Sequence, residues 1–271
     1  MPEISTAVSS SVFYRKMGAG PAVVLLHGFP ESGTLWQNVW DELARSYTVI
    51  IPDFPGSGNS ILEKETSIED MAAYVKAIMD DERIDNAVIA GHSMGGYVAF
   101  AFAALYPGMV KGLSLVHSIP EADDAEKIKT RLKSIELIRK GAKSTFLSHM
   151  IPNLFSTNFR EAQPLIVKLQ IDEAMKMEDN GLVNFYNAMI SRSDRTNLLK
   201  TATYPLQWII GIYDNIIPYK KILEHSYKSD VNFVSIYPDC GHMSMIETPE
   251  KLISDFKSFI HYSHYLHPYK E

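Results

Sequence analysis

The chain has 271 residues, of which 46% are hydrophobic and 21% are charged, a balance typical of a globular protein long enough for one large α/β domain. Its formal net charge of −6 argues against a nucleic-acid partner, because binding to phosphates requires clustered lysine and arginine. The single cysteine, Cys240, excludes an internal disulfide bond and a metal site built from cysteines.

The apolar runs also bear on where the protein is located. Residues 1–16 show no basic segment followed by an apolar core, so we expect no secretory signal. No apolar run approaches the length needed to span a bilayer, and we expect no membrane partner. These features predict a cytoplasmic protein.

Strand and helix patterns alternate from about residue 12 onward. In chain order, apolar runs and helical spacing predict a strand at 12–16, a strand at 23–26, a helix at 36–44, a strand at 49–51 and a helix at 66–81. Thr66 and Glu69 form a possible capping box for the last of these. The loop at 53–60 has two glycines but lacks the third glycine and the helix start of a dinucleotide fingerprint, so it is interpreted as a tight structural loop.

Residues 86–106 change from a strand pattern to a helix pattern with almost no loop between them. At the junction, Gly91-His92-Ser93-Met94-Gly95 fits G-x-S-x-G, in which a serine is held in a strained turn between a strand and a helix. The glycines leave the space that this turn needs. The helix that follows directs free N–H groups toward an oxygen that gains negative charge. We therefore predict that Ser93 is a nucleophile.

A strand pattern at 113–116 is followed by a long interval that contains no convincing buried strand. Helical stripes occur instead at 128–138, 165–177 and 183–190. Helices inserted between two strands are typical of a cap that lies over a site. We therefore predict a core domain of residues 1–117 and 204–271, and a helical cap (lid) insertion of residues 118–203.

The core pattern returns after the predicted cap. We expect a strand at 206–210, a helix at 219–227, a strand at 231–237 and a closing helix that Thr248 caps. Strands that alternate with helices throughout predict an α/β fold with a mostly parallel central sheet and helices on both faces.

A serine hydroxyl is a poor nucleophile near neutral pH, so it needs a base and an acid that orients the base. Asp214 and His242 each follow a predicted strand at the carboxyl edge of the sheet, where ligands bind in open α/β folds. The order Ser93, Asp214, His242 is the order of the α/β-hydrolase triad. The alternative candidates for the acid are Glu121, Asp123 and Asp124.

Taken together, these motifs resemble those of the α/β-hydrolase superfamily, specifically its cap-bearing serine hydrolase and esterase branch. The matching stretches are His27-Gly28-Phe29-Pro30, residues 53–60, residues 91–96, Gly211-Ile212-Tyr213-Asp214 with Pro218, and Gly241-His242. The resemblance extends over about residues 12–260 and implies an oxyanion hole formed by the backbone N–H groups of Phe29 and Met94. Residues 27–32 also resemble epoxide hydrolases and haloalkane dehalogenases, but those enzymes use an aspartate nucleophile.

Several further side chains are candidates to line a substrate pocket. They are His92, His117, Met150, Phe155, Phe185 and Met189. Methionine-rich linings adapt to varied apolar groups. His261, His264 and His267 have a spacing that could suit a metal, but without carboxylate neighbours they are expected to complement a helix end. We expect no metal ion, no organic cofactor and an unreactive Cys240.

The sequence therefore predicts a serine hydrolase that cleaves a carboxylic ester of a small-to-medium apolar molecule through an acyl-enzyme. An aminopeptidase and a carbon–carbon bond hydrolase remain alternatives because they share the triad. Acidic cap residues that could hold a substrate amine, such as Glu173, Glu178 and Asp179, keep the peptidase possible. A ligand receptor that retains the pocket with little turnover is a further alternative.

Overall fold

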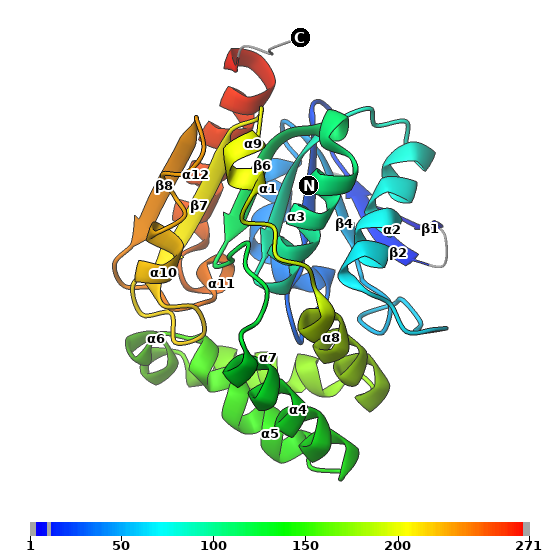
Figure 1. Ribbon diagram of the computed structural model, residues 1–271, viewed down its shortest axis with the longest axis vertical. Coiled ribbons are helices and arrows are strands. Elements are labelled where there is room, and N and C mark those ends of the chain that lie inside the picture. Colours follow the sequence, from blue (N-terminus) through cyan, green and yellow to red (C-terminus); the bar gives the residue numbers. More distant parts are fainter. Residues whose placement is uncertain (1–3, 10–11, 268–271) are drawn as a thin grey trace.

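One sheet of eight strands, in the order β1-β2-β4-β3-β5-β6-β7-β8, organises the fold (Figure 1). The computed structural model describes residues 4–9 and 12–267. The strands are β1 (Ile4–Ser9), β2 (Val12–Met17), β3 (Ala22–Leu26), β4 (Thr48–Pro52), β5 (Ala87–His92), β6 (Val110–Val116), β7 (Leu206–Gly211) and β8 (Asn232–Tyr237). β2 pairs antiparallel with β1 and with β4, and the neighbouring pairs from β4 to β8 are parallel. The predicted mostly parallel sheet is confirmed. β1 was not predicted and forms one edge of this sheet.

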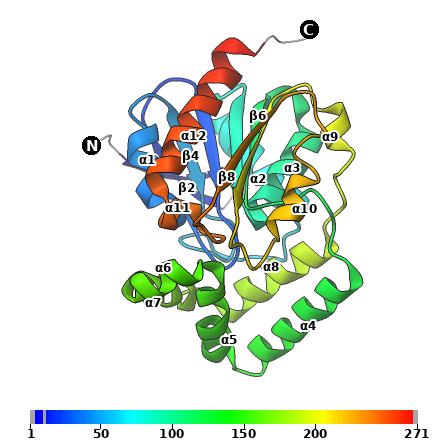
Figure 2. The ribbon, with the colours of Figure 1, turned by 90° about the vertical axis from the view of Figure 1, so that its left-hand side faces the viewer.

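Helices cover both faces of the sheet, as the alternating pattern predicts (Figure 2). One face carries α1 (Gln37–Leu43) and α12 (Pro249–His261), and the other carries α2 (Ile68–Asp81) and α3 (Met94–Leu105). The shorter elements of this part are η1 (Gly33–Trp36), η2 (Pro107–Met109), α9 (Leu198–Thr201), α10 (Tyr219–Leu223), α11 (Ser244–Glu247) and η4 (Tyr262–Leu266). A sheet buried on both sides explains why its central strands are continuous apolar runs.

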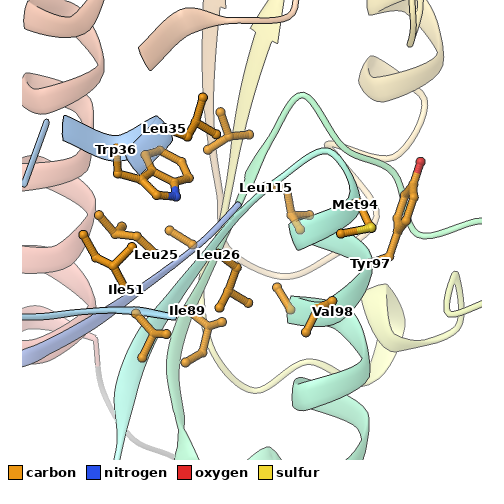
Figure 3. Packing of buried hydrophobic residues seen from close by; sticks show 14 of the residues in the cluster. Leu25, Leu26, Leu35, Trp36, Ile51, Ile89, Met94, Tyr97, Val98 and Leu115 are labelled. Carbon is orange, nitrogen blue, oxygen red and sulfur yellow. The ribbon is translucent and has the colours of Figure 1, made fainter. Parts of the chain in front are cut away.

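The core consists of side chains that the two faces of the sheet bury against these helices. Figure 3 shows Trp36 and Ile51 on one side of the sheet and Tyr97 and Val98 of α3 on the other. Trp36, Ile51 and Val98 are fully buried. Burying one such apolar side chain contributes about 1.5–3 kcal/mol, and this packing holds the strand ends that carry the site in fixed positions.

The chain between β6 and β7 forms helices that lie beyond the carboxyl ends of the parallel strands (Figures 1 and 2). They are α4 (Ala125–Arg139), α5 (Lys143–Met150), η3 (Ile151–Leu154), α6 (Thr157–Ala162), α7 (Pro164–Met175) and α8 (Asp179–Ser191), and we call them the helical layer. The predicted stripes at 128–138, 165–177 and 183–190 correspond to α4, α7 and α8. The division of the chain into a core domain and a cap stays a prediction.

Helix ends were predicted less accurately than helices. The capping box of α2 is formed by Ser67 and Asp70, not by Thr66 and Glu69. Thr66 instead exchanges hydrogen bonds with Asn184 of the helical layer, at 2.8 Å in each direction. Thr248 is the N-cap residue of α12, with Pro249 in the first turn, as predicted.

At that position the Thr248 hydroxyl donates to the Ser244 carbonyl and makes no cap hydrogen bond to α12. The helix predicted at 219–227 ends early, at Leu223. Within residues 4–9 and 12–267, none of the helices has both the length and the apolar character that crossing a bilayer requires.

Candidate active site

β5 passes directly into α3 at Ser93, whose backbone has φ = 50° and ψ = −112°. A non-glycine residue with positive φ is strained and persists only where its surroundings impose it. A Cβ atom at Gly91 would lie 2.2 Å from the Gly95 carbonyl oxygen, and one at Gly95 would lie 2.4 Å from the Leu26 carbonyl oxygen. Both glycines of the G-x-S-x-G motif are therefore required sterically.

Hydrogen bonds on both sides of the Ser93 peptide hold this turn. The Ser93 N–H donates to the Val116 carbonyl at 2.9 Å, and the Ser118 hydroxyl donates to the Ser93 carbonyl at 2.8 Å. Both partners belong to β6 or to the loop after it. The candidate nucleophile is thus fixed to the neighbouring strand.

Asp214 and His242 lie in direct contact after β7 and β8. His242 Nδ1 is 2.7 Å from Asp214 Oδ2, and both side chains are buried. The other carboxylate oxygen accepts the N–H groups of Ile216 and Ile217 at 2.8 and 2.9 Å. Burial opposes ionisation of Asp214, but its interactions with the imidazole rings of His242 and His117 outweigh the effect of burial and hold the pKa of this carboxyl well below its usual range. An ionised Asp214 accepts a hydrogen bond from Nδ1–H of His242, and this arrangement leaves Nε2 as the ring atom that can take a proton.

His92, the residue before Ser93, links the candidate nucleophile to His242. Its Nε2 lies 2.9 Å from the His242 carbonyl oxygen, and the two rings have centroids 4.8 Å apart. The structure therefore brings the loops that carry Ser93, Asp214 and His242 together at one edge of the sheet.

A buried carboxylate completes the contacts of His92. Glu31 Oε2 lies 3.0 Å from His92 Nδ1 and accepts the Gly28 N–H at 3.2 Å. A carbonyl oxygen can only accept a hydrogen bond, so His92 Nε2 carries a hydrogen. A hydrogen bond between His92 Nδ1 and the Glu31 carboxylate then needs a second proton, on either Nδ1 or Glu31, because both atoms are otherwise acceptors. The pair fixes the ring beside Ser93.

His117 is a second histidine at Asp214. It is fully buried, has φ = 50°, and its Nδ1 lies 3.4 Å from Asp214 Oδ2. Burial lowers the pKa of His117 to about 4, so the ring is neutral near pH 7. His117, Asp214 and His242 offer ligand atoms within 4.8 Å of one another, a spacing that could hold a metal ion. The Asp214 oxygens are already engaged by His242 and two backbone N–H groups, a pattern that suits an oriented acid and base better.

The loop with the predicted oxyanion donor Phe29 is anchored through His27. The His27 Nε2 atom accepts the Phe54 N–H at 3.0 Å, and Nδ1 lies 2.8 Å from the Gly28 carbonyl oxygen. Burial lowers the pKa of His27, which keeps the ring neutral for this role. The second predicted donor, Met94, begins α3, so its N–H has no partner within the helix. That both N–H groups face one oxygen stays a prediction.

A cavity of about 450 Å³ lies beside the candidate site. It runs between α7 and the loops after β3 and β4, and its wall includes Glu31 and Met243, which adjoin His92 and His242. Its lining does not include Ser93, nor the predicted pocket residues Met150, Phe155, Phe185 and Met189. These four side chains pack with the core instead: Met150 is half-buried, and the other three are buried. The other two predicted pocket residues, His92 and His117, lie against the His242 ring. Which of these six residues touch a substrate stays a prediction.

The alternative acids have other partners. Asp123 forms ion pairs with Arg131 at 2.5 Å and Arg192 at 2.9 Å. Glu121 lies 2.8 Å from His225, and Asp124 caps α4.

The remaining histidines and the cysteine also have partners that explain them. His264 and His267 contact the carbonyl oxygens of Ala22 and Thr203, and the His261 ring lies against Tyr265. Cys240 is fully buried, which raises the pKa of its thiol.

Comparison with known proteins agrees with the fold. Residues 21–133 match the family model described as alpha/beta hydrolase fold. A thermophilic esterase from Thermogutta terrifontis has a similar structure, with a TM-score of 0.90 and 26% sequence identity, over 97% of this chain and 99% of that one. The chain has the α/β-hydrolase fold.

Two curated relatives are similar to this chain over most of its length. A pimeloyl-[acyl-carrier protein] methyl ester esterase of Pseudoalteromonas atlantica is 25% identical, over 89% of this chain and 95% of the relative. A 2-hydroxy-6-oxo-6-(2'-aminophenyl)hexa-2,4-dienoic acid hydrolase of Metapseudomonas resinovorans is 24% identical, over 91% of this chain and 86% of the relative. The resemblance seen in the sequence motifs is confirmed.

Proposed function

We propose that this α/β hydrolase cleaves carboxylic esters with Ser93 as nucleophile, His242 as general base and Asp214 as the acid that orients the base. The observation that carries the proposal is the 2.7 Å contact between His242 Nδ1 and Asp214 Oδ2 at the sheet edge where Ser93 sits in its strained turn. This contact leaves Nε2 of His242 as the only ring atom that can take a proton.

The reaction follows from these roles. Ser93 Oγ attacks the ester carbonyl carbon while His242 Nε2 takes the hydroxyl proton, and the N–H groups of Phe29 and Met94 bind the resulting oxyanion. His242 then gives its proton to the leaving alcohol, which produces an acyl-enzyme. Water, deprotonated by the same ring, releases the acid. One lost oxyanion donor costs about 3 kcal/mol of barrier in other enzymes.

In this proposal the helical layer acts as the cap over the active site. Its Tyr186 ring packs against Phe29, with centroids 4.4 Å apart, and its Leu154 carbonyl accepts the His242 N–H at 2.7 Å. The layer would enclose the substrate over the sheet edge and limit water near the acyl-enzyme. The substrate class in this proposal, a small-to-medium apolar acyl or alcohol group, comes from the methionine-rich sequence of the layer.

The test compares turnover of p-nitrophenyl esters of increasing acyl length by wild type and Ser93→Ala. The variant is expected to fall to the background rate while its circular dichroism spectrum stays unchanged. Ser254→Ala, at an exposed position of α12, is the matched control and should keep wild-type turnover. Hydrolysis by Ser93→Ala at the wild-type rate would remove the mechanism.

Cleavage of a carbon–carbon bond is the second candidate, because the relative from Metapseudomonas resinovorans bears the name of a dienoic acid hydrolase. An amide substrate is a further possibility through a pyrrolizixenacetamide deacetylase of Xenorhabdus hominickii, 27% identical over 93% of this chain. Assays of matched ester, anilide and vinylogous diketone substrates separate the three reactions. A cytoplasmic location is part of the same proposal.

A further inference from the structure

The Glu247 carboxylate of α11 binds the backbone on both sides of His242. The Gly241 N–H lies 3.0 Å from Glu247 Oε1 and 3.1 Å from Oε2, and the Met243 N–H lies 3.3 Å from Oε1. The Ser156 N–H, which follows η3 in the helical layer, donates to Oε2 at 3.1 Å. One carboxylate therefore joins the loop of the proposed base to the helical layer.

A second set of bonds ties the same two parts together. The His242 N–H donates to the Leu154 carbonyl at 2.7 Å. The Asn215 side chain, next to Asp214, donates to the Asn153 carbonyl at 3.4 Å. Residues 153–156 of the helical layer thus contact the loops of both the proposed acid and the proposed base.

The loop of His242 is also confined sterically. A Cβ atom at Gly241 would lie 2.5 Å from the Ser156 nitrogen, and one at Gly211 would lie 2.0 Å from the Gly241 carbonyl oxygen. The Gly241 peptide is therefore held between the end of β7 and the helical layer, with no room for a side chain on either glycine. Small displacements of residues 153–156 would be transmitted to His242.

The charge of Glu247 is balanced by these N–H groups. Among the described residues, Glu247 forms no ion pair with lysine or arginine within 4.0 Å, whereas three backbone donors converge on its two oxygens. Hydrogen bonds to an ionised acceptor are stronger than neutral ones and depend on both oxygens remaining acceptors. An amide at this position would present an NH₂ group to one of those donors.

We propose that Glu247 is a positioning residue that locks the His242 loop onto residues 153–156, so that the geometry of the base depends on a docked helical layer. This inference rests on the proposed function of His242. Glu247 forms no bond with Ser93, Asp214 or the His242 ring among the described residues, and it acts through the backbone of its neighbours.

Glu247→Gln is the first variant, because it preserves size and removes one acceptor. A misplaced base slows the chemical step, so kcat is expected to fall about tenfold to a hundredfold while KM stays within about twofold. Glu250→Gln, exposed in the first turn of α12, is the matched control and should keep the wild-type kcat. A kcat of Glu247→Gln within twofold of wild type would overturn the proposal.

Ser156→Pro tests the other end of the contact with a substitution that lies outside the His242 loop. Ser156 has φ = −60° and Phe155 has ψ = 152°, values that proline and the residue before it adopt readily. Proline removes the N–H that Glu247 accepts, and it also removes the hydroxyl that caps α6. Ser156→Ala removes only that hydroxyl, so it is the matched control.

We expect Ser156→Pro to lower kcat about fivefold or more relative to Ser156→Ala. Combined with Glu247→Gln, it should lower kcat little further, because both substitutions break the same contact. Equal kcat values for the proline and alanine variants would contradict the coupling. Full additivity in the double variant would contradict it as well.

Hydrogen exchange supplies a readout that does not need turnover. In Glu247→Gln, the amides of residues 241–243 and 153–156 are expected to lose protection together, whereas Glu250→Gln should match wild type. Unchanged protection of both segments would overturn the docking role. If wild type shows no Ser93-dependent turnover, the proposed function fails, and the exchange result still decides whether Glu247 holds the two segments together.

Discussion

His242 Nδ1 and Asp214 Oδ2 meet at 2.7 Å although 28 residues separate them in the sequence. The contact follows from the sheet, because β7 and β8 are parallel neighbours in which Gly211 pairs with Tyr237. Loops that leave the same edge at the same level lie side by side. The register of two strands therefore sets the distance between the proposed acid and base.

Asp214→Asn is expected to lower kcat by about three to four orders of magnitude, because the amide no longer stabilises the imidazolium and favours the wrong tautomer. The corresponding change in the chymotrypsin-type triad costs about 10⁴. The measurement is kcat/KM for a p-nitrophenyl ester. Asp239→Asn, at an exposed position before the His242 loop, is the control and should retain activity. A loss of less than about tenfold in Asp214→Asn would assign the orienting role elsewhere.

Gly95→Ala should destabilise the fold by about 1–3 kcal/mol or more, because the added Cβ would meet the carbonyl oxygens of Leu26 and His27 at 2.4 and 2.6 Å. Urea unfolding followed by tryptophan fluorescence measures this change. A Cβ at Gly108 meets no atom within 4 Å, so Gly108→Ala should change stability by about 0.5 kcal/mol at most. Equal midpoints for the two variants would show that the elbow tolerates a side chain.

The buried His117 predicts a loss of stability in mild acid. Its pKa is lowered to about 4 by burial, with Asp214, His242 and His92 also facing it, whereas an unfolded histidine has a pKa near 6.5. The unfolded state therefore binds a proton first, and the stabilisation that is complete above pH 6.5 is lost as the pH falls toward 4. Between pH 7 and pH 5 this amounts to about 2 kcal/mol.

His117→Asn tests this assignment, because asparagine tolerates positive φ and does not titrate in this range. The free energy of unfolding of wild type should drop by about 2 kcal/mol more than that of the variant between pH 7 and pH 5. Parallel pH dependence of the two proteins would mean that another group causes any acid sensitivity.

Cys240 should resist alkylation in the native protein. The side chain is fully buried, and burial raises the pKa of its thiol, so little thiolate is present or accessible. Iodoacetamide at pH 8 is expected to modify the protein only after a denaturant is added, as measured by intact mass. Rapid labelling of the native protein, at the rate of a free thiol, would contradict the buried position.

The strands and the candidate site could be predicted because their signals are local. Five consecutive residues, 91–95, are enough to predict the turn at Ser93 and its two glycines. The chain order Ser93, Asp214, His242 then indicates which family of serine hydrolases the chain resembles. The apolar runs of β3 to β7 reflect burial on both faces. These features needed no knowledge of distant contacts.

Other features depend on contacts that no local pattern encodes. Thr66 bonds to Asn184, 118 residues away, which leaves the capping of α2 to Ser67. The links of Glu247 to Ser156 and of His92 to Glu31 likewise join segments that are remote in sequence. β1 has few large apolar residues, so its pairing with β2 gave no signal.

Covalent labelling shows directly whether Ser93 is the nucleophile. Wild-type protein is incubated with a fluorophosphonate, and peptide mapping by mass spectrometry locates the adduct. We expect one adduct on Ser93, none on Ser93→Ala, and labelling of His242→Gln slowed by about a hundredfold or more. An adduct on another residue, or equally fast labelling of His242→Gln, would contradict the proposed mechanism.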